Sequence, residues 1–234
     1  VVEVNSETDF VAKNATFQEF VQAVADKALK SSVEKAGDGE DVCSILDMKS
    51  ELEEKTLTIG EKLSIRRFEK LTGDCVASYI HGGGRIGVIV DADTTVVNDA
   101  VKEALTNIAM QIAALNPKYV SRDEVSADYI AHEKEILLAQ IMNDPKESQK
   151  PEKVIHGMIE GRISKELKEI CLVDQVYVKA EDGKQTVGKY LEQVSKEVGA
   201  PVSVKKFVRF ETGEGLEKKN EDFAAEVAAQ IAGN

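Results

Sequence analysis

The three histidines are the residues in this sequence with the widest chemical repertoire, and their spacing does not suit a reactive centre. His81, His132 and His156 occur neither in a His-Glu-x-x-His pattern nor close to a cysteine, as most metal sites would require. The cysteines are odd in number and far apart, so we interpret them as reduced thiols. They are Cys43, Cys75 and Cys171. We therefore expect no catalytic residue, no metal and no cofactor.

A glycine-rich stretch over residues 82–87 resembles a phosphate-binding loop at first sight. A P-loop needs Gly-x-x-x-x-Gly-Lys-Ser/Thr, and a dinucleotide fingerprint leads from a strand into a helix. Here the glycines lie between two apolar runs of strand character, so a β-hairpin turn is the favoured interpretation. The alternative is an enzyme that uses a nucleotide, and it predicts that the isolated chain binds GDP or ATP.

Asp9 and Phe10 place an acid beside a large aromatic residue in a polar turn that follows a strand. One interpretation is a helix-capping aspartate next to a phenylalanine that packs inward, and residue chemistry alone favours it. The other is a presented binding tip, because aromatic anchors beside charge carry much of the energy of protein interfaces. The two interpretations differ in whether Phe10 is exposed.

Composition favours a soluble protein of acidic character. The 234 residues include 42 acidic and 30 basic side chains, for a net charge of −12, and 42% are hydrophobic. This content is ample for a core, and the charge disfavours the phosphate backbone of a nucleic acid as main partner. No apolar run is long enough to cross a bilayer, so we expect a soluble, intracellular chain. Val1 is not an initiator methionine, and we expect upstream material to have been lost.

The periodicity of the first half alternates between helix and strand. Val2 and Val4 predict a strand, and Thr16 with Glu19 forms a capping-box pattern at the start of a helix. The apolar pattern predicts further helices over 44–55 and 97–115 and strands over 63–71, 76–80 and 86–90. Proline cannot continue a helical ladder, so Pro117 ends the last helix.

The second half begins with an antiparallel helical hairpin over 121–170, in which two apolar stripes flank a turn at Pro145. Such a hairpin could serve as a scaffold or a dimerisation element, which is a third interpretation of the chain. Mixed elements follow: a strand over 172–178, a helix over 186–197, a strand over 202–211 and a helix over 222–231. The pattern predicts an α+β class with two lobes.

Residues 4–14 read Val-Asn-Ser-Glu-Thr-Asp-Phe-Val-Ala-Lys-Asn and resemble the signature of the elongation factor Ts family. Further stretches resemble family positions in family order: 59–61, 65–67, 79–82, 85–88, 108–111, 160–162, 186–188, 213–217 and 222–227. These blocks span the whole chain, which makes coincidence a poor explanation. The resemblance implies the core and carboxy-terminal parts of such a factor, without the amino-terminal helical module of the family.

The resemblance implies an α+β core of small antiparallel sheets with packed helices, plus a protruding helical hairpin. We expect an N-terminal core subdomain over 1–76 and a C-terminal core subdomain over 77–119 and 171–211. Residues 120–170 would form the hairpin, of dimerisation type, and 212–234 a C-terminal module.

The resemblance also implies the partner, the GTPase elongation factor Tu, for which the family promotes GDP exchange without bond chemistry. Carried over by motif, Asp9 and Phe10 would reach the G domain of Tu near its magnesium site. The other partner-binding positions implied are Ile59, Gly60, His81, Val178, Lys179, Asp222 and Phe223. Self-association through the hairpin and a bacterial cytoplasm, plastid stroma or mitochondrial matrix are further implications.

Overall fold

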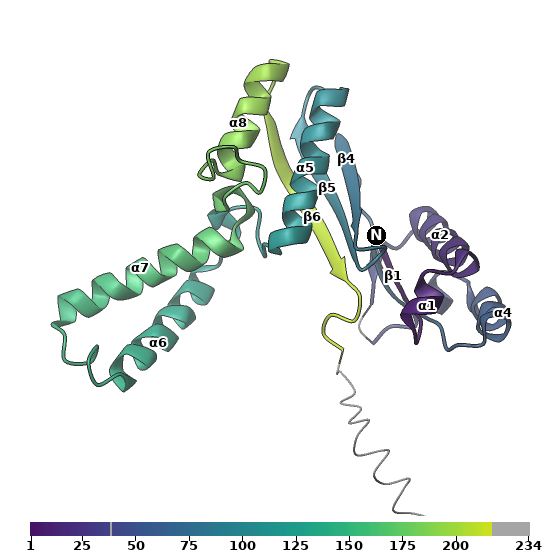
Figure 1. Cartoon of the computed structure of the whole chain (residues 1–234), viewed down its shortest axis with the longest axis horizontal. Coiled ribbons are helices and arrows are strands. Elements are labelled where there is room, and N and C mark those ends of the chain that lie inside the picture. Colours follow the sequence, from purple (N-terminus) through teal and green to yellow (C-terminus); the bar gives the residue numbers. More distant parts are fainter. Residues whose placement is uncertain (38, 217–234) are drawn as a thin grey trace, which may run out of the picture.

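The computed structural model describes residues 1–37 and 39–216. The described part of the chain is a mixed α and β structure with two antiparallel sheets of three strands each, ordered β1-β3-β2 and β4-β5-β6. The second sheet lies at the centre, the smaller lobe with the first sheet lies on one side, and a long helical hairpin projects on the other (Figure 1). The α+β class and its protruding hairpin are thus confirmed.

The N-terminal lobe packs one long helix against its small sheet. Its elements are β1 (Val2–Asn5), α1 (Asp9–Ala12), α2 (Ala15–Lys30), β2 (Lys35–Ala36), α3 (Val42–Ile45), α4 (Lys49–Ile59) and β3 (Ser64–Glu69). The apolar stripe of α2, with Phe17, Phe20 and Val24, is buried against Phe68 of the central strand β3. The apolar residues that the 3.6-residue period places on one face of α2 pack against those that alternate on one face of β3, and together they form one core.

The central lobe contains the second sheet, with α5 and α8 packed on it. Its elements are β4 (Cys75–His81), β5 (Ile86–Thr94), α5 (Asp99–Leu115), a 3-10 turn (Leu172–Asp174), α8 (Val187–Val198) and β6 (Val202–Glu211). Val88 and Val90 of β5 are buried against Leu105 and Ile108 of α5. Because β5 is the middle strand of this sheet, its apolar residues lie at the centre of the sheet face on which α5 and α8 pack.

The projecting hairpin consists of α6 (Ala127–Asn143) and α7 (Glu152–Ile170), preceded by a 3-10 turn (Arg122–Glu124). Ile141 of α6 and Ile159 of α7 are buried in a third hydrophobic cluster. Polar pairs also join the two helices, since Tyr129 donates to Glu166 at 2.5 Å and Lys134 donates to Glu160 at 2.5 Å. The hairpin therefore has its own core and does not depend on either sheet for its packing.

Three sequence-based predictions of local structure are wrong. The strand over 172–178 is a 3-10 turn followed by one isolated bridge, because Leu172 and Tyr177 both turn into the central core. The helix over 44–55 is two helices, separated at Asp47 with a φ of 52°. Asn14, not Thr16, caps α2 through a bond from the Thr16 amide, so the capping box is wrong too. The helix predicted over 222–231 lies outside the described residues.

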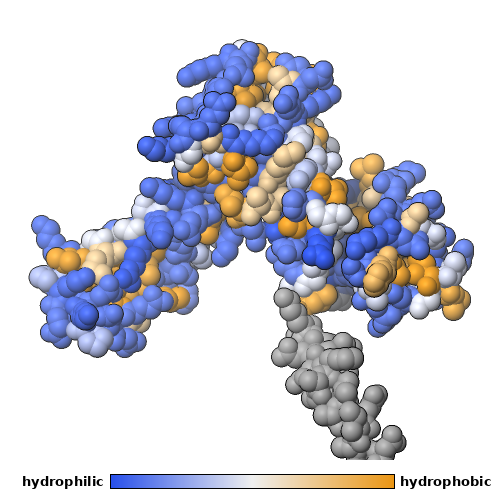
Figure 2. Space-filling model, in the orientation of Figure 1, coloured by the Kyte–Doolittle hydropathy of each residue, from blue (hydrophilic) through white to orange (hydrophobic). Residues whose placement is uncertain are grey.

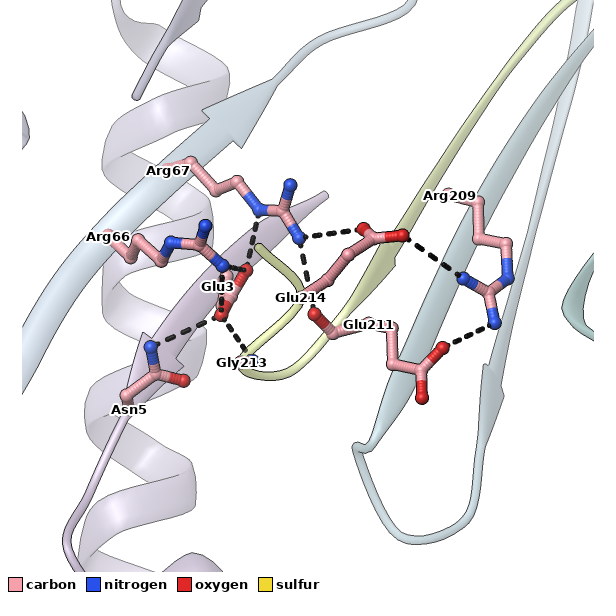
Figure 3. Close-up of polar contacts among 8 residues, drawn as sticks. All are labelled: Glu3, Asn5, Arg66, Arg67, Arg209, Glu211, Gly213 and Glu214. Atoms are coloured by element: carbon pink, nitrogen blue, oxygen red, sulfur yellow. Dashed lines mark hydrogen bonds and ion pairs between the residues drawn. The ribbon is translucent and has the colours of Figure 1, made fainter. Parts of the chain in front are cut away.

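A buried carboxylate joins the two lobes. Glu3 on β1 is 2% exposed, and its carboxylate accepts hydrogen bonds from Arg66 at 3.0 Å and Arg67 at 2.5 Å, both on β3. The same carboxylate accepts the backbone amide of Gly213, just after β6, at 2.9 Å (Figure 3). Arg67 also reaches the carboxylate of Glu214 at 3.2 Å. The carboxylate of Glu3 therefore accepts hydrogen bonds from both lobes and connects them.

The environment of Glu3 sets its titration. Burial alone would raise the pKa of Glu3, but the bonds from Gly213, Arg66 and Arg67 outweigh it and hold the pKa below its ordinary value of 4.5. Because the pKa is lower in the folded than in the unfolded chain, ionised Glu3 stabilises the fold above about pH 4.5. That stabilisation is lost as the pH falls through the folded pKa.

Replacing Glu3 by glutamine is expected to lower the free energy of unfolding by about 3 kcal/mol at pH 7, because two arginines lose their buried counter-charge. Urea unfolding of the wild type and the variant from pH 7 downwards measures the effect, and the difference should shrink as the pH drops below 4.5. Glu34→Gln is the matched control, since Glu34 is 72% exposed beside Lys70. A pH-independent difference would contradict this account.

Candidate functional site

The turn at residues 8–13 presents Phe10 to solvent. Thr8 is the N-cap of α1, and its side-chain oxygen accepts the amide of Val11 at 3.4 Å. Phe10, the second residue of this one-turn helix, is 80% exposed. The inward-packing interpretation of Phe10 and the capping role for Asp9 are therefore wrong, and the structure favours a presented tip.

The other side of the same turn is seated on the lobe. Val11 and Ala12 are partly buried and pack against the N-terminal core. Asp9 and Lys13 form an exposed ion pair at 2.9 Å, which lowers the pKa of Asp9 through the hydrogen bond and charge of Lys13. One helical turn thus divides into an anchored apolar side and a tip with an aromatic ring beside a carboxylate.

The end of α4 lies beside this tip. Ile59 is partly buried against the N-terminal core, and Gly60 ends the helix in the left-handed region with a φ of 81°. Glu61, the next residue, accepts the backbone amides of Glu7 and Thr8 and so connects the two segments. Leu57 on the last turn of α4 is 85% exposed, and sequence reasoning missed it because its helix has a weak apolar stripe.

The hairpin between β4 and β5 approaches the tip from the central lobe. His81 is exposed at the end of β4, and its Nδ1 lies 3.0 Å from the hydroxyl of Tyr79. Gly82, Gly83 and Gly84 have φ values of 61°, 66° and 99°, and the chain leads into β5, which confirms the predicted hairpin turn. The charge of Arg85 in this hairpin contributes to the lowered pKa of Asp9. The hairpin lies against the N-terminal lobe, since a Cβ at Gly87 would lie 2.9 Å from a methyl carbon of Val1.

Val178 and Lys179 occupy a different place, in the loop before α8. Val178 is 47% exposed while its backbone amide donates to the buried side chain of Gln111 at 2.7 Å. Lys179 donates to Asn107 on α5 at 2.6 Å. These contacts hold the loop against the central lobe. Asp222 and Phe223 lie outside the described residues.

Hydrophobic side chains also reach the surface away from the tip. Figure 2 shows hydrophobic areas on the smaller lobe, beside the central sheet and along the projecting hairpin. Within residues 1–37 and 39–216, no group of three or more His, Cys, Asp or Glu side chains could hold a metal ion. The described helices include none that is long and apolar enough to span a membrane. All three cysteines are buried free thiols.

Comparison with known proteins gives this arrangement a context. The family model for "Elongation factor TS" matches residues 7–214. Elongation factor Ts of Clostridioides difficile is 48% identical over 240 aligned positions, which cover 99% of this chain and 75% of that protein. Elongation factor Ts of Clostridium novyi is 44% identical, and the alignment covers 98% of this chain and 75% of that protein. Elongation factor Ts of Clostridium perfringens is also 44% identical, and the alignment covers 97% of this chain and 75% of that protein.

These matches define a protein of the translation elongation factor class. The chain belongs to the elongation factor Ts family, as its motifs predicted. Membership implies a nucleotide-exchange factor for elongation factor Tu in translation elongation. The signature over residues 4–14 includes the turn that presents Phe10.

Replacing Phe10 by alanine is expected to change the free energy of unfolding by no more than about 0.5 kcal/mol, because the ring is already exposed. Phe20→Ala is the matched control, since Phe20 is 3% exposed in the same lobe and its loss should cost about 3 to 5 kcal/mol. Thermal or urea unfolding of both variants measures the contrast. A large destabilisation by Phe10→Ala would contradict the presented tip.

Proposed function

We propose that this chain promotes GDP release from elongation factor Tu by inserting Asp9 and Phe10 near the magnesium and nucleotide site of that GTPase. The observation that carries the proposal is the 80% exposure of Phe10 on a turn whose other side is anchored in the lobe. An aromatic ring that is exposed in the free protein is removed from water only when a partner binds, so its burial can stabilise the complex. The neighbouring carboxylate of Asp9 adds a charge suited to disturbing a bound cation and its phosphates.

The mechanism requires differential binding and no bond chemistry. If the factor binds nucleotide-free Tu more tightly than nucleotide-bound Tu, linkage makes it weaken GDP by the same ratio. Each tenfold weakening needs about 1.4 kcal/mol, and a ring buried at the centre of an interface is worth about 2 kcal/mol or more. Insertion of Phe10 therefore supplies enough free energy for a large part of the effect.

The other contacts extend the same surface. Ile59, Gly60 and His81 would bind the G domain of Tu as well. Glu61 connects the end of α4, with Ile59 and Gly60, to the segment before the tip. Val178 and Lys179 would bind a second face of the partner, and Asp222 with Phe223 would place the end of the chain against the G domain. The proposed division into subdomains over 1–76, 77–119 with 171–211, 120–170 and 212–234 assigns the tip to the first.

The proposal places the activity in the compartment of translation, the cytoplasm of a bacterium or the equivalent organelle compartment. It involves no membrane, no nucleic-acid contact and no nucleotide site on this chain. Calorimetry of the chain with GDP alone, without Tu, should therefore show no binding. Micromolar affinity for GDP would favour the enzyme alternative based on residues 82–87.

Phe10→Ala is expected to lower the maximal rate of GDP release from Tu by at least about tenfold, because the inserted ring would carry at least 1.4 kcal/mol of differential binding. Release of fluorescent GDP from Tu at saturating factor measures it. Leu29→Ala is the control, since Leu29 is 72% exposed at the end of α2, outside the proposed contacts, and its variant should match the wild type. Normal release with Phe10→Ala would remove Phe10 from the mechanism.

We also propose self-association through the projecting hairpin. Leu138 and Met142 are 43% and 54% exposed, four residues apart on α6, and Val154 on α7 is 46% exposed. Spacing of four residues places the first two on one helical face, which a second hairpin could cover.

Leu138→Glu is expected to shift the chain from dimer to monomer, because the interface would bury a charge. Sedimentation equilibrium across micromolar concentrations measures the shift. Glu135→Gln on the same helix is the control, since Glu135 is exposed and the substitution adds no apolar burial. A wild type that stays monomeric throughout would contradict self-association.

A further inference from the structure

The carboxylate of Glu61 gathers three donors from the segment that leads into the tip. Its Oε2 accepts the backbone amide of Glu7 at 3.1 Å and that of Thr8 at 3.0 Å. Its Oε1 accepts the hydroxyl of Thr8 at 2.5 Å. These bonds join positions more than 50 residues apart in sequence. A carboxylate with several backbone amide donors is a strong, charge-assisted acceptor.

Glu7 returns the interaction. Its Oε2 accepts the backbone amide of Lys62 at 3.1 Å, so each of the two glutamates binds the backbone beside the other. The two segments are therefore latched in both directions. We call the contacts of Glu7, Thr8, Glu61 and Lys62 the double latch.

The double latch connects directly to the helix that carries Phe10. The Thr8 hydroxyl donates to Glu61 and accepts the amide of Val11, which makes it both a latch contact and the N-cap of α1. Fixing the rotamer of Thr8 therefore fixes the start of the turn. Phe10 follows two residues later.

The turn needs such support. A helix of four residues lies far below the length at which helices form in isolation. Its ion pair between Asp9 and Lys13 has side chains that are 59% and 73% exposed, so it contributes little. The turn is held by the packing of Val11 and Ala12, by a hydrogen bond from Gln18 to the Ala12 carbonyl at 3.3 Å, and by the double latch.

We propose that Glu61 is a positioning residue that holds the Asp9–Phe10 tip in its presented conformation before the partner binds. The inference rests on the proposed role of Phe10. Glu61 acts through Thr8 and the backbone, and its carboxylate is already occupied by three donors, so it does not itself touch the nucleotide. Its loss makes the presented conformation one of several, and the apparent affinity for the partner falls by the fraction that remains.

The test is GDP release from Tu as a function of factor concentration, with Glu61→Ala. The expected result is a half-saturating concentration raised about fivefold, because only part of the population presents the tip, with a maximal rate unchanged within about twofold. Phe10→Ala, in contrast, should lower the maximal rate. Amide hydrogen exchange of residues 7–13 in the free factor should become faster in Glu61→Ala.

Further variants separate the effect of geometry from the effect of charge. Glu61→Gln keeps an oxygen for both amides and an NH₂ group that can donate to the Thr8 hydroxyl, so its half-saturating concentration should lie closer to that of the wild type than to that of Glu61→Ala. Glu54→Ala removes the same charge from the exposed face of α4, away from the latch, and should behave as wild type. Thr8→Val should also raise the half-saturating concentration, and the combined effect of Thr8→Val and Glu61→Ala should be smaller than the product of the two single effects.

Each alternative outcome overturns the inference. Unchanged half-saturation in Glu61→Ala while Phe10→Ala slows release would show that the tip holds without Glu61. A Glu61→Gln variant as weak as Glu61→Ala would assign the effect to charge, and additive effects of Thr8→Val and Glu61→Ala would separate Glu61 from the turn. Normal release with Phe10→Ala would instead defeat the proposed function itself, so the two failures are distinguishable.

Discussion

The buried carboxylate of Glu3 is the interaction on which the relative placement of the two lobes depends. It binds β3 of its own lobe through Arg66 and Arg67 and the turn after β6 of the other through the Gly213 amide. A second contact supports it, because Val1 packs so closely on Gly87 that a Cβ there would lie 2.9 Å from its methyl group. The tip and the His81 hairpin belong to different lobes, so these contacts fix the position of one relative to the other.

A buried ionic cluster stabilises the contact between two lobes less than its charges suggest, because desolvation opposes their attraction. It gives directional contacts that a smooth apolar interface lacks. Arg67 shows this, because its guanidinium bonds Glu3 and Glu214 while lying 4.2 Å from the centre of the Phe210 ring. Such a set of fixed angles suits a protein whose proposed action requires two segments to be presented together.

The spacing of apolar residues predicted the regular helices and strands whose buried faces it sets. The stripe that includes Leu105 and Ile108 predicted α5, and the alternation through Val88 and Val90 predicted β5. The region after α7 escaped, because Leu172 and Tyr177 reach the core through a 3-10 turn that has no regular period. In the candidate site, the motif located Phe10, but the bonds that connect the segment before it to the rest of the lobe come from Glu61, 51 positions beyond Phe10. No pattern within the turn contains that information.

The exposed ring of Phe10 and the anchored side of its turn form one physical design. A large apolar side chain in water has its burial free energy, on the order of 2 kcal/mol, still available for a complex. That free energy is reduced if the ring must first be ordered, because fixing backbone and rotamers opposes binding. The hydrogen bonds of Glu61, which follows α4, order this segment when the protein folds, so the ordering does not oppose binding later. In the proposed mechanism, burial of Phe10 then contributes almost fully to the affinity for the partner.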